Sequence, residues 1–156
     1  MVKRVSAVLI WALFILACTS MLSATDSAQG TADQAQAMVE KASKFLNEKG
    51  TDVAYKAFTD KTDGFVLNDL YIFVVQYDGL TVAHGGNPKI VGKNMLNLKD
   101  SDGKLFIQEM INLAQKGGGW VDYKWVNPQS KKIEPKSTYV KAVDGMKAFY
   151  GCGIYK

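Results

Sequence analysis

Apolar residues recur in steps of three and four through the first folded segment that the sequence predicts. Between Asp33 and Lys49 they are Ala35, Met38, Val39, Ala42, Phe45 and Leu46. This spacing gathers them on one face of a helix, and Gly50 follows where that helix would end. The pattern predicts an amphipathic helix over residues 33–49 and, after it, a short helix capped by Asp52.

The pattern then becomes that of a β-sheet. Residues 69–77 are aromatic and β-branched with little charge, which predicts a central strand. Asp78-Gly79 is a hairpin signal. Residues 80–84 are therefore expected to return as the paired strand.

The C-terminal part of the chain contributes a further helix and three strands. Residues 103–116 show a helical apolar pattern, with Asp102 as the expected N-cap. Strands are predicted over residues 120–126, 137–143 and 146–155. Strands joined largely by hairpins exclude an all-parallel sheet, so the sequence predicts an α+β fold in which helices pack on an antiparallel sheet.

The first residues have the pattern of an export signal. Lys3 and Arg4 precede an apolar run over residues 5–17, and polar residues follow. The run is shorter than the roughly 20 residues that a membrane-spanning helix needs. We therefore expect the protein to be exported to the periplasm.

Three fates of this segment remain open. Cleavage after Ala24 would release a secreted protein. Alternatively, Cys18 closes a lipobox-like Ile-Leu-Ala-Cys sequence and would become a lipid-anchored first residue. An uncleaved anchor is the third possibility. We expect residues 1–24 to be the signal peptide, 25–32 a linker and 33–156 the single folded domain.

Composition and charge narrow the class of protein. The chain has 156 residues, of which 47% are hydrophobic and 22% charged, and this is a globular rather than a disordered composition. The basic residues behind the net charge of +4 are scattered, which argues against a nucleic-acid groove. Two cysteines and a single histidine exclude a disulfide scaffold, a four-ligand zinc site and a paired-histidine site.

One acidic segment imitates part of a calcium-binding loop. Aligning Gly103 with the invariant glycine of such a loop places Glu109 at the bidentate position. Leu98 then stands at the first ligand position without a side-chain oxygen. We therefore expect no metal here, but a turn that leads into the Asp102 cap.

Several motifs between residues 69 and 155 agree in order and spacing with one domain family. They include Asp69-Leu70-Tyr71-Ile72-Phe73-Val74, Tyr77-Asp78-Gly79, Asn87-Pro88-Lys89-Ile90-Val91-Gly92, Gly119-Trp120-Val121-Asp122-Tyr123-Lys124-Trp125 and Gly151-Cys152-Gly153-Ile154-Tyr155. Over residues 33–156 the chain resembles a single Cache domain. The resemblance implies a PAS-like fold: a long N-terminal helix on a five-stranded antiparallel sheet, a helix inserted between strands two and three, and a small organic ligand in a pocket over the sheet.

The resemblance also implies a role in signal transduction. Such domains usually lie between two transmembrane helices of chemoreceptors and sensor kinases, whereas this sequence ends at Lys156, directly after its last predicted strand. We therefore expect a stand-alone exported domain that signals through a separate membrane sensor kinase or chemoreceptor. The helix over residues 33–49 is the expected coupling element. If a homodimer forms through this helix, its Met38 and Phe45 side would be partly exposed.

A pocket for a small carboxylate needs a cation or several hydrogen-bond donors between apolar walls. We expect Lys136 to supply the charge, tyrosine hydroxyls and His84 to donate hydrogen bonds, and aromatic rings to form the walls. Each residue alone has an ordinary alternative: core packing for a ring, a solvated strand edge for Lys136, a structural bond to the following turn for His84. The candidate ligand-binding residues are Tyr71, Phe73, His84, Tyr123, Trp125, Lys136 and Tyr139.

The sequence predicts a ligand-binding sensor module rather than an enzyme. The ligand would be an organic acid of two to four carbons, and neither a cofactor nor a nucleic-acid partner is implied. The alternative is an exported accessory subunit of a membrane sensor, without a ligand of its own. Catalysis would need a second acid–base group beside His84, for which Asp122 and Asp78 are the candidates.

Overall fold

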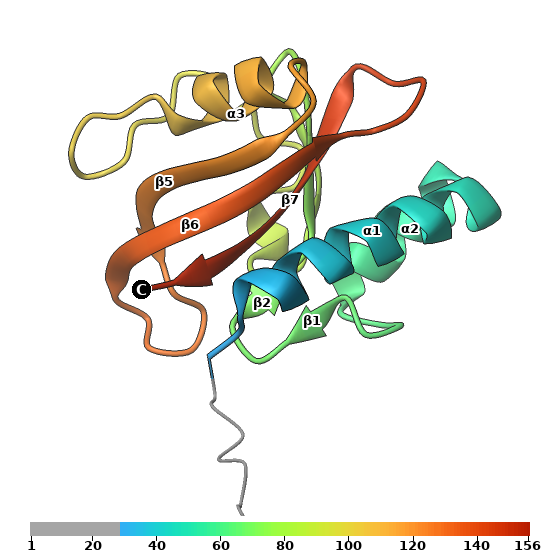
Figure 1. Cartoon of the computed structure of the whole chain (residues 1–156), viewed down its shortest axis with the longest axis horizontal. Coiled ribbons are helices and arrows are strands. Elements are labelled where there is room, and N and C mark those ends of the chain that lie inside the picture. Colours follow the sequence, from blue (N-terminus) through green and yellow to red (C-terminus); the bar gives the residue numbers. More distant parts are fainter. Residues whose placement is uncertain (1–28) are drawn as a thin grey trace, which may run out of the picture.

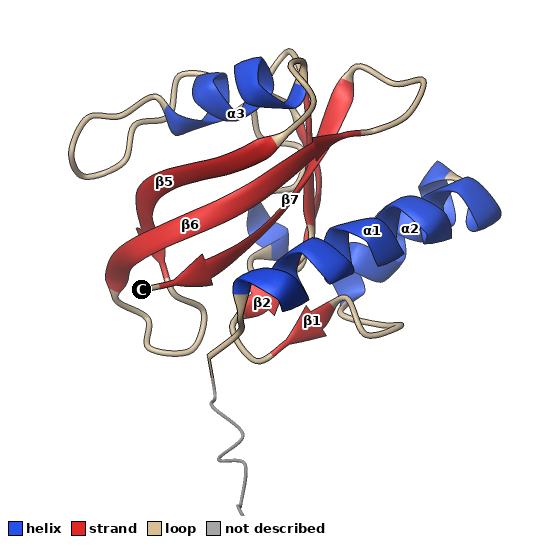
Figure 2. Ribbon diagram, viewed as in Figure 1, coloured by secondary structure: helices blue, strands red, loops and turns tan. Residues whose placement is uncertain are grey.

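The computed structural model of the chain describes residues 29–156 (Figure 1). The predicted export signal, Cys18 and most of the predicted linker lie outside the described residues. A five-stranded antiparallel sheet carries helices α1 (Ala32–Lys49) and α2 (Thr51–Asp60) on one face and α3 (Phe106–Ala114) on the other (Figures 1 and 2). The predicted α+β fold is confirmed.

Helix α1 is amphipathic, as predicted, and has a capping box at its start. The Thr31 hydroxyl accepts a hydrogen bond from the Gln34 backbone N–H at 3.3 Å, and the Gln34 side chain accepts one from the Thr31 N–H at 2.9 Å. The apolar face of the helix lies on the sheet. Met38 is therefore buried, with its sulfur 3.8 Å from the Cys152 thiol, whereas Phe45 is half-buried, so the partial exposure expected for a dimer face is found at Phe45 and not at Met38.

Helix α2 follows α1 directly after Gly50. The positive φ of Gly50, 80°, lets the chain end one helix and begin the next without a connecting loop. Gly50 itself is the N-cap, and no side chain caps the helix. The predicted Asp52 cap is wrong because Asp52 already lies in the first helical turn.

The main sheet has the strand order β4-β3-β7-β6-β5, and all neighbouring strands are antiparallel. The C-terminal strand thus lies in the centre of the sheet, and the β3–β4 hairpin forms one edge. These strands correspond to the five that the sequence predicts. They are β3 (Phe73–Gln76), β4 (Thr81–His84), β5 (Gly119–Val126), β6 (Ile133–Ala142) and β7 (Ala148–Tyr155).

The strand predicted over residues 69–77 is divided in the structure. Its first part, β2 (Leu70–Tyr71), pairs with a short strand, β1 (Val66–Leu67), that the sequence did not reveal. Only residues from Phe73 onward join the β4 and β7 neighbours of the main sheet. The side chain of Tyr71 nevertheless stays on the same face as Phe73, so the predicted alternation holds across the break.

The connection between β4 and α3 is a long loop, residues 85–105, that contains one short 3₁₀ helix, η1 (Pro88–Ile90). The Asp100 carboxylate holds its last part, because it accepts hydrogen bonds from the backbone N–H groups of Asp102, Lys104 and Lys124 at 2.9–3.0 Å. The predicted Asp102 cap is wrong: α3 begins four residues later, and no side chain caps it.

Candidate functional site

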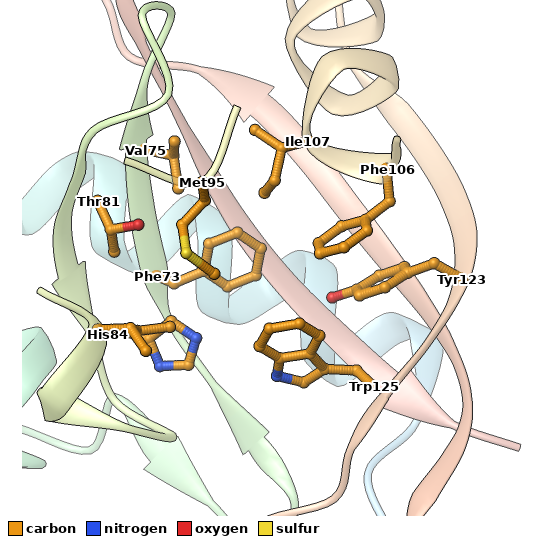
Figure 3. A pocket seen from close by; sticks show the side chains of 10 residues that line it. Phe73, Val75, Thr81, His84, Met95, Phe106, Ile107, Tyr123 and Trp125 are labelled. Atoms are coloured by element: carbon orange, nitrogen blue, oxygen red, sulfur yellow. The ribbon is translucent and has the colours of Figure 1, made fainter. Parts of the chain in front are cut away.

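A small cavity lies between the sheet and α3 (Figure 3). Its volume is about 20 Å³, which is room for one water-sized group. Three strands, helix α3 and the 85–105 loop all contribute to its wall. The residues that line it are Phe73, Val75, Thr81, His84, Ile90, Met95, Phe106, Ile107, Tyr123 and Trp125.

A wider cleft opens beside this cavity. Its volume is about 440 Å³, which lies within the usual range for small-molecule sites. It runs between the start of the 85–105 loop and the end of β5. His84, Ile90 and Trp125 line both the cavity and the cleft, so these three side chains stand between the two spaces.

Lys136 is a buried cation with only 1% of its surface exposed; it lines neither the cavity nor the cleft, but is bonded to Tyr71, which lines the cleft. Its ammonium donates hydrogen bonds to the hydroxyls of Tyr71 at 2.6 Å and Tyr155 at 3.2 Å, and lies 3.9 Å from the centroid of the Tyr71 ring. Among residues 29–156, no carboxylate lies within ion-pair distance of it. Burial lowers the pKa of Lys136 to about 7, and the negative charge of the buried Asp69 opposes this shift only in part.

His84 is held in one neutral form. Its Nδ1 accepts a hydrogen bond from the Asn87 backbone N–H at 2.9 Å, so the proton of the neutral ring is on Nε2. Burial, and next the nearby charge of Lys136, lower the pKa of His84 to about 3. The imidazole lies 4.9 Å from the ring of Tyr71 and stacks at 5.6 Å on that of Phe73. The structural bond to the following turn is thus present, and Nε2 remains a neutral donor.

Stacked aromatic rings form the far wall of the cavity (Figure 3). The Phe106 ring of α3 stacks on the Tyr123 ring of β5, with centroids 4.5 Å apart and planes 7° apart, and the Trp125 ring lies 5.4 Å from Phe106. The Tyr123 hydroxyl is bonded to the Thr138 hydroxyl at 3.1 Å, and burial raises its pKa. This wall offers a carbon chain apolar contact.

The structure gathers most of the predicted ligand-binding residues on this side of the sheet. Tyr71 lines the cleft, and Lys136 lies behind it, bonded to its hydroxyl. The alternative reading of Lys136, a solvated strand edge, is excluded by its burial. The predicted residues that line the cavity itself are Phe73, His84, Tyr123 and Trp125.

Tyr139 is the exception. Its ring packs at 5.5 Å from that of Trp120 in the core beneath α1, on the opposite face of the sheet. Lys136 and Tyr139 are three residues apart on β6, and an odd separation turns two strand side chains to opposite faces. The prediction that Tyr139 shares a pocket with Lys136 is therefore wrong.

Thr81 is a cavity residue that the sequence reasoning missed. It is 1% exposed, and its hydroxyl has no hydrogen-bond partner among the described residues. A threonine in a predicted strand carries no signal of such a position. Ile90 and Met95 come from the loop, whose course the sequence does not reveal, whereas the apolar face of the predicted α3 could have led to Phe106.

The two carboxylates considered as catalytic partners of His84 have other contacts. Asp122 forms an ion pair with Lys156 at 3.0 Å, and Asp78 accepts the Leu80 backbone N–H at 3.0 Å. Within residues 29–156, no group of three or more histidine, cysteine or acidic side chains is placed to hold a metal ion. In the same part of the chain, no helix has both the length and the apolar character needed to cross a membrane.

Two curated proteins are similar to this chain in sequence. The sensor histidine kinase MctS of Rhizobium johnstonii is 38% identical over 87 residues, which cover 56% of this chain and 19% of that protein. The methyl-accepting chemotaxis protein McpP of Pseudomonas putida is 29% identical over 97 residues, which cover 62% of this chain and 16% of that protein. The chain therefore matches less than a fifth of the length of either relative.

Solved structures show the same fold. A Cache chemosensory domain, described for its recognition of carboxylic acids, superposes with a TM-score of 0.69 at 26% identity, over 79% of this chain and 91% of that one. A methyl-accepting chemotaxis protein of Vibrio parahaemolyticus has a TM-score of 0.68 at 23% identity, over 79% and 86%. The family model for single Cache domain 2 matches residues 18–156. The chain belongs to this family of extracytoplasmic sensor domains, homologous to periplasmic domains of chemoreceptors and sensor kinases.

Proposed function

We propose that this protein is a periplasmic sensor module that binds a small organic acid over the α3 face of its sheet and signals to a separate membrane sensor kinase or chemoreceptor. In this proposal residues 1–24 direct export, and the protein performs no chemistry on its ligand. The acid has two to four carbons. Its carboxylate lies at Tyr71, His84 and Lys136, and its carbon chain lies against the aromatic wall of the cavity.

The observation that carries the proposal is the buried ammonium of Lys136. An isolated buried charge is costly, and proteins normally pair it or neutralise it. Here its partners are two neutral hydroxyls, Tyr71 and Tyr155. A carboxylate that approaches through the cleft would supply the missing counter-charge, and would displace or share the Tyr71 hydroxyl. Charge-assisted hydrogen bonds of this kind are stronger than neutral ones.

Two further observations support the same ligand class. The cavity beside this polar end is lined by Phe73, Phe106 and Tyr123, whose apolar faces suit a short carbon chain once the cavity widens beyond its volume of about 20 Å³. In addition, the similar Cache chemosensory domain is described as recognising carboxylic acids.

A thermal-shift and calorimetry screen tests the proposal. Acetate, propionate and butyrate are each added to the purified protein, and a ligand at a hundred times its Kd should raise the free energy of unfolding by about 2.7 kcal/mol. Lys136→Met removes the charge but keeps an apolar side chain, and should abolish the response of a stably folded protein. The matched control is Lys141→Met on the same strand, because Lys141 pairs with Glu40 at 2.7 Å on the other face.

The outcomes separate the alternatives. Binding that Lys136→Met abolishes and Lys141→Met preserves supports the proposal. Unchanged affinity in Lys136→Met would contradict the role of this amine. No thermal shift with any short acid would contradict the ligand class and favour an accessory subunit that binds a partner protein only.

A further inference from the structure

Among the polar groups that line the cavity, the Thr81 hydroxyl has no contact that explains its position. It is 1% exposed and has no hydrogen-bond partner among residues 29–156. Thr81 lines the cavity, and Figure 3 shows its oxygen turned toward the interior, near Met95 and Val75. A buried hydroxyl without a partner costs free energy, so such a group in a cavity wall points to something that the cavity receives.

The register of the strands places Thr81 far from Lys136 and from the tyrosine hydroxyls to which Lys136 donates. Thr81 pairs with Val75, and His84 pairs with Phe73. Tyr71, which accepts the Lys136 bond, lies four residues before Val75 along the same extended segment, or about 13 Å at the rise of a strand. The site is therefore elongated: a cation and its tyrosine at one end, His84 with Phe73 in the middle, and a neutral hydroxyl at the other end.

We propose that Thr81 is a specificity-determining residue, and that its hydroxyl binds an oxygen at the end of the ligand's carbon chain remote from the carboxylate. The protein then prefers short acids with a terminal hydroxyl or carbonyl oxygen to plain alkyl acids of the same length. This inference rests on the proposed function, because it assumes that a carboxylate occupies the Lys136 end.

The charges of the residues around the cavity limit which chemical group of the ligand can lie at Thr81. The residues that line it include neither lysine nor arginine, and His84 is neutral. A second carboxylate at Thr81 would therefore be buried without a counter-charge, which is far more costly than burying a hydroxyl. The expected ligand is a monocarboxylate with a distal neutral oxygen, and dicarboxylates are rejected.

Calorimetry with matched acids tests this inference. Butyrate, 4-hydroxybutyrate, 2-hydroxybutyrate and succinate are titrated into the wild-type protein and into Thr81→Val, which replaces the hydroxyl by a methyl group of similar size. The wild type should bind 4-hydroxybutyrate about tenfold more tightly than butyrate, because one good hydrogen bond to a buried group is gained. The 2-hydroxy isomer should show no such gain, and succinate should bind more weakly than butyrate.

Variants separate a role in recognition from a role in folding. Thr81→Val should lose the preference for 4-hydroxybutyrate and keep its affinity for butyrate, and its stability should not fall, since no hydrogen bond within the described residues is lost. Thr81→Ser keeps the hydroxyl and should keep the preference. The control is Thr138→Val, another fully buried threonine, whose hydroxyl is bonded to Tyr123 at 3.1 Å. It should lower stability without changing the ratio of the two affinities.

The result that would overturn the inference is distinct from a failure of the proposed function. If the wild type binds butyrate and 4-hydroxybutyrate equally, or if Thr81→Val leaves the preference unchanged, water or nothing satisfies Thr81 and the inference falls while acid binding stands. If no acid binds the wild type at all, the proposed function fails, and this inference fails with it.

Discussion

The face of the sheet under α1 and α2 is packed mainly by apolar rings, although the Tyr150 hydroxyl is buried there without a hydrogen-bond partner among residues 29–156, whereas the face under α3 buries a charged side chain, Lys136, beside a cavity and a cleft. On the first face, the rings of Phe45, Phe58 and Phe65 lie with centroids 4.6–6.3 Å apart in edge-on or tilted contacts. On the second, Lys136 and Thr81 are each 1% exposed, and among residues 29–156 Lys136 has no ion-pair partner and the Thr81 hydroxyl has no hydrogen-bond partner.

The two faces of the sheet therefore contribute differently to the free energy of folding. A buried group that awaits a ligand lowers the stability of the free protein. The well-packed face offsets that cost, because burial of apolar surface is the main stabilising contribution to folding. The same strands contribute side chains to both faces, because alternate residues of β6 and β7 point to opposite sides of the sheet. Mutations on the two faces should therefore have different consequences: stability on one, recognition on the other.

The largest effect on stability is expected on the α1–α2 face. Phe58→Ala removes a fully buried ring and should lower the free energy of unfolding by about 3–5 kcal/mol in a urea titration. The control on the same helix is Val53→Ala, where the side chain is 53% exposed and the change should stay within about 0.5 kcal/mol. Wherever Phe58→Ala remains folded, its affinity for short acids should match the wild type. A large loss of affinity in the folded variant would contradict the division between faces.

The second prediction concerns pH and belongs to the α3 face. The pKa of Lys136 is about 7 in the folded protein against 10.5 in a free side chain. Between these values the unfolded chain binds more protons than the folded one, so stability should rise with pH, by up to about 1.4 kcal/mol per pH unit. His84, with a pKa of about 3 against 6.5, acts in the same direction, so stability should fall as the pH drops below 6.5.

Denaturant titrations across these two pH ranges measure the effect. Lys136→Met should flatten the rise above about pH 7 and keep the larger part of the fall below 6.5, because burial, and not the charge of Lys136, is the main cause of the lowered pKa of His84. Lys141→Met should retain the rise, since Lys141 is paired with Glu40 near the surface. An equal rise in wild type and Lys136→Met would show that the buried amine is not its source.

The fold was predictable from the sequence because its signals are local and repeated. The apolar residues of α1 recur at helical spacing, and the hairpin signal Asp78-Gly79 does connect β3 and β4. The errors lie at element ends. Asp52 and Asp102 were predicted as caps from residue type alone, but a cap depends on where the first turn begins. Helix α2 begins at Thr51 with Gly50 as its cap, and α3 begins only at Phe106, after the loop that Asp100 holds.

The site was less predictable, for a physical reason. Its aromatic residues follow from strand alternation, and strict use of that rule would also have separated Lys136 from Tyr139. The burial of Lys136, in contrast, depends on Tyr71 and Tyr155, which are 65 and 19 residues away in sequence. The absence of a hydrogen-bond partner for Thr81 within residues 29–156 depends on the course of the loop that places Met95 in the same cavity wall. No local pattern encodes either of these contacts.

The last prediction has the smallest expected effect on stability, and it compares two tryptophans of β5 that lie on opposite faces of the sheet. Trp120 packs on Tyr139 beneath α1, whereas Trp125 lines both the cavity and the cleft. Because the cavity of about 20 Å³ holds only one water-sized group and Trp125 is one of the three side chains between it and the cleft, we expect an acid that enters from the cleft to displace the Trp125 ring. Trp125→Phe should therefore speed both the binding and the release of propionate severalfold in stopped-flow measurements, so that Kd changes less than either rate.

Trp120→Phe should leave both rates unchanged, although each substitution lowers stability by less than Phe58→Ala does. Equal rates in the two variants would mean that the acid reaches the cavity without passing Trp125.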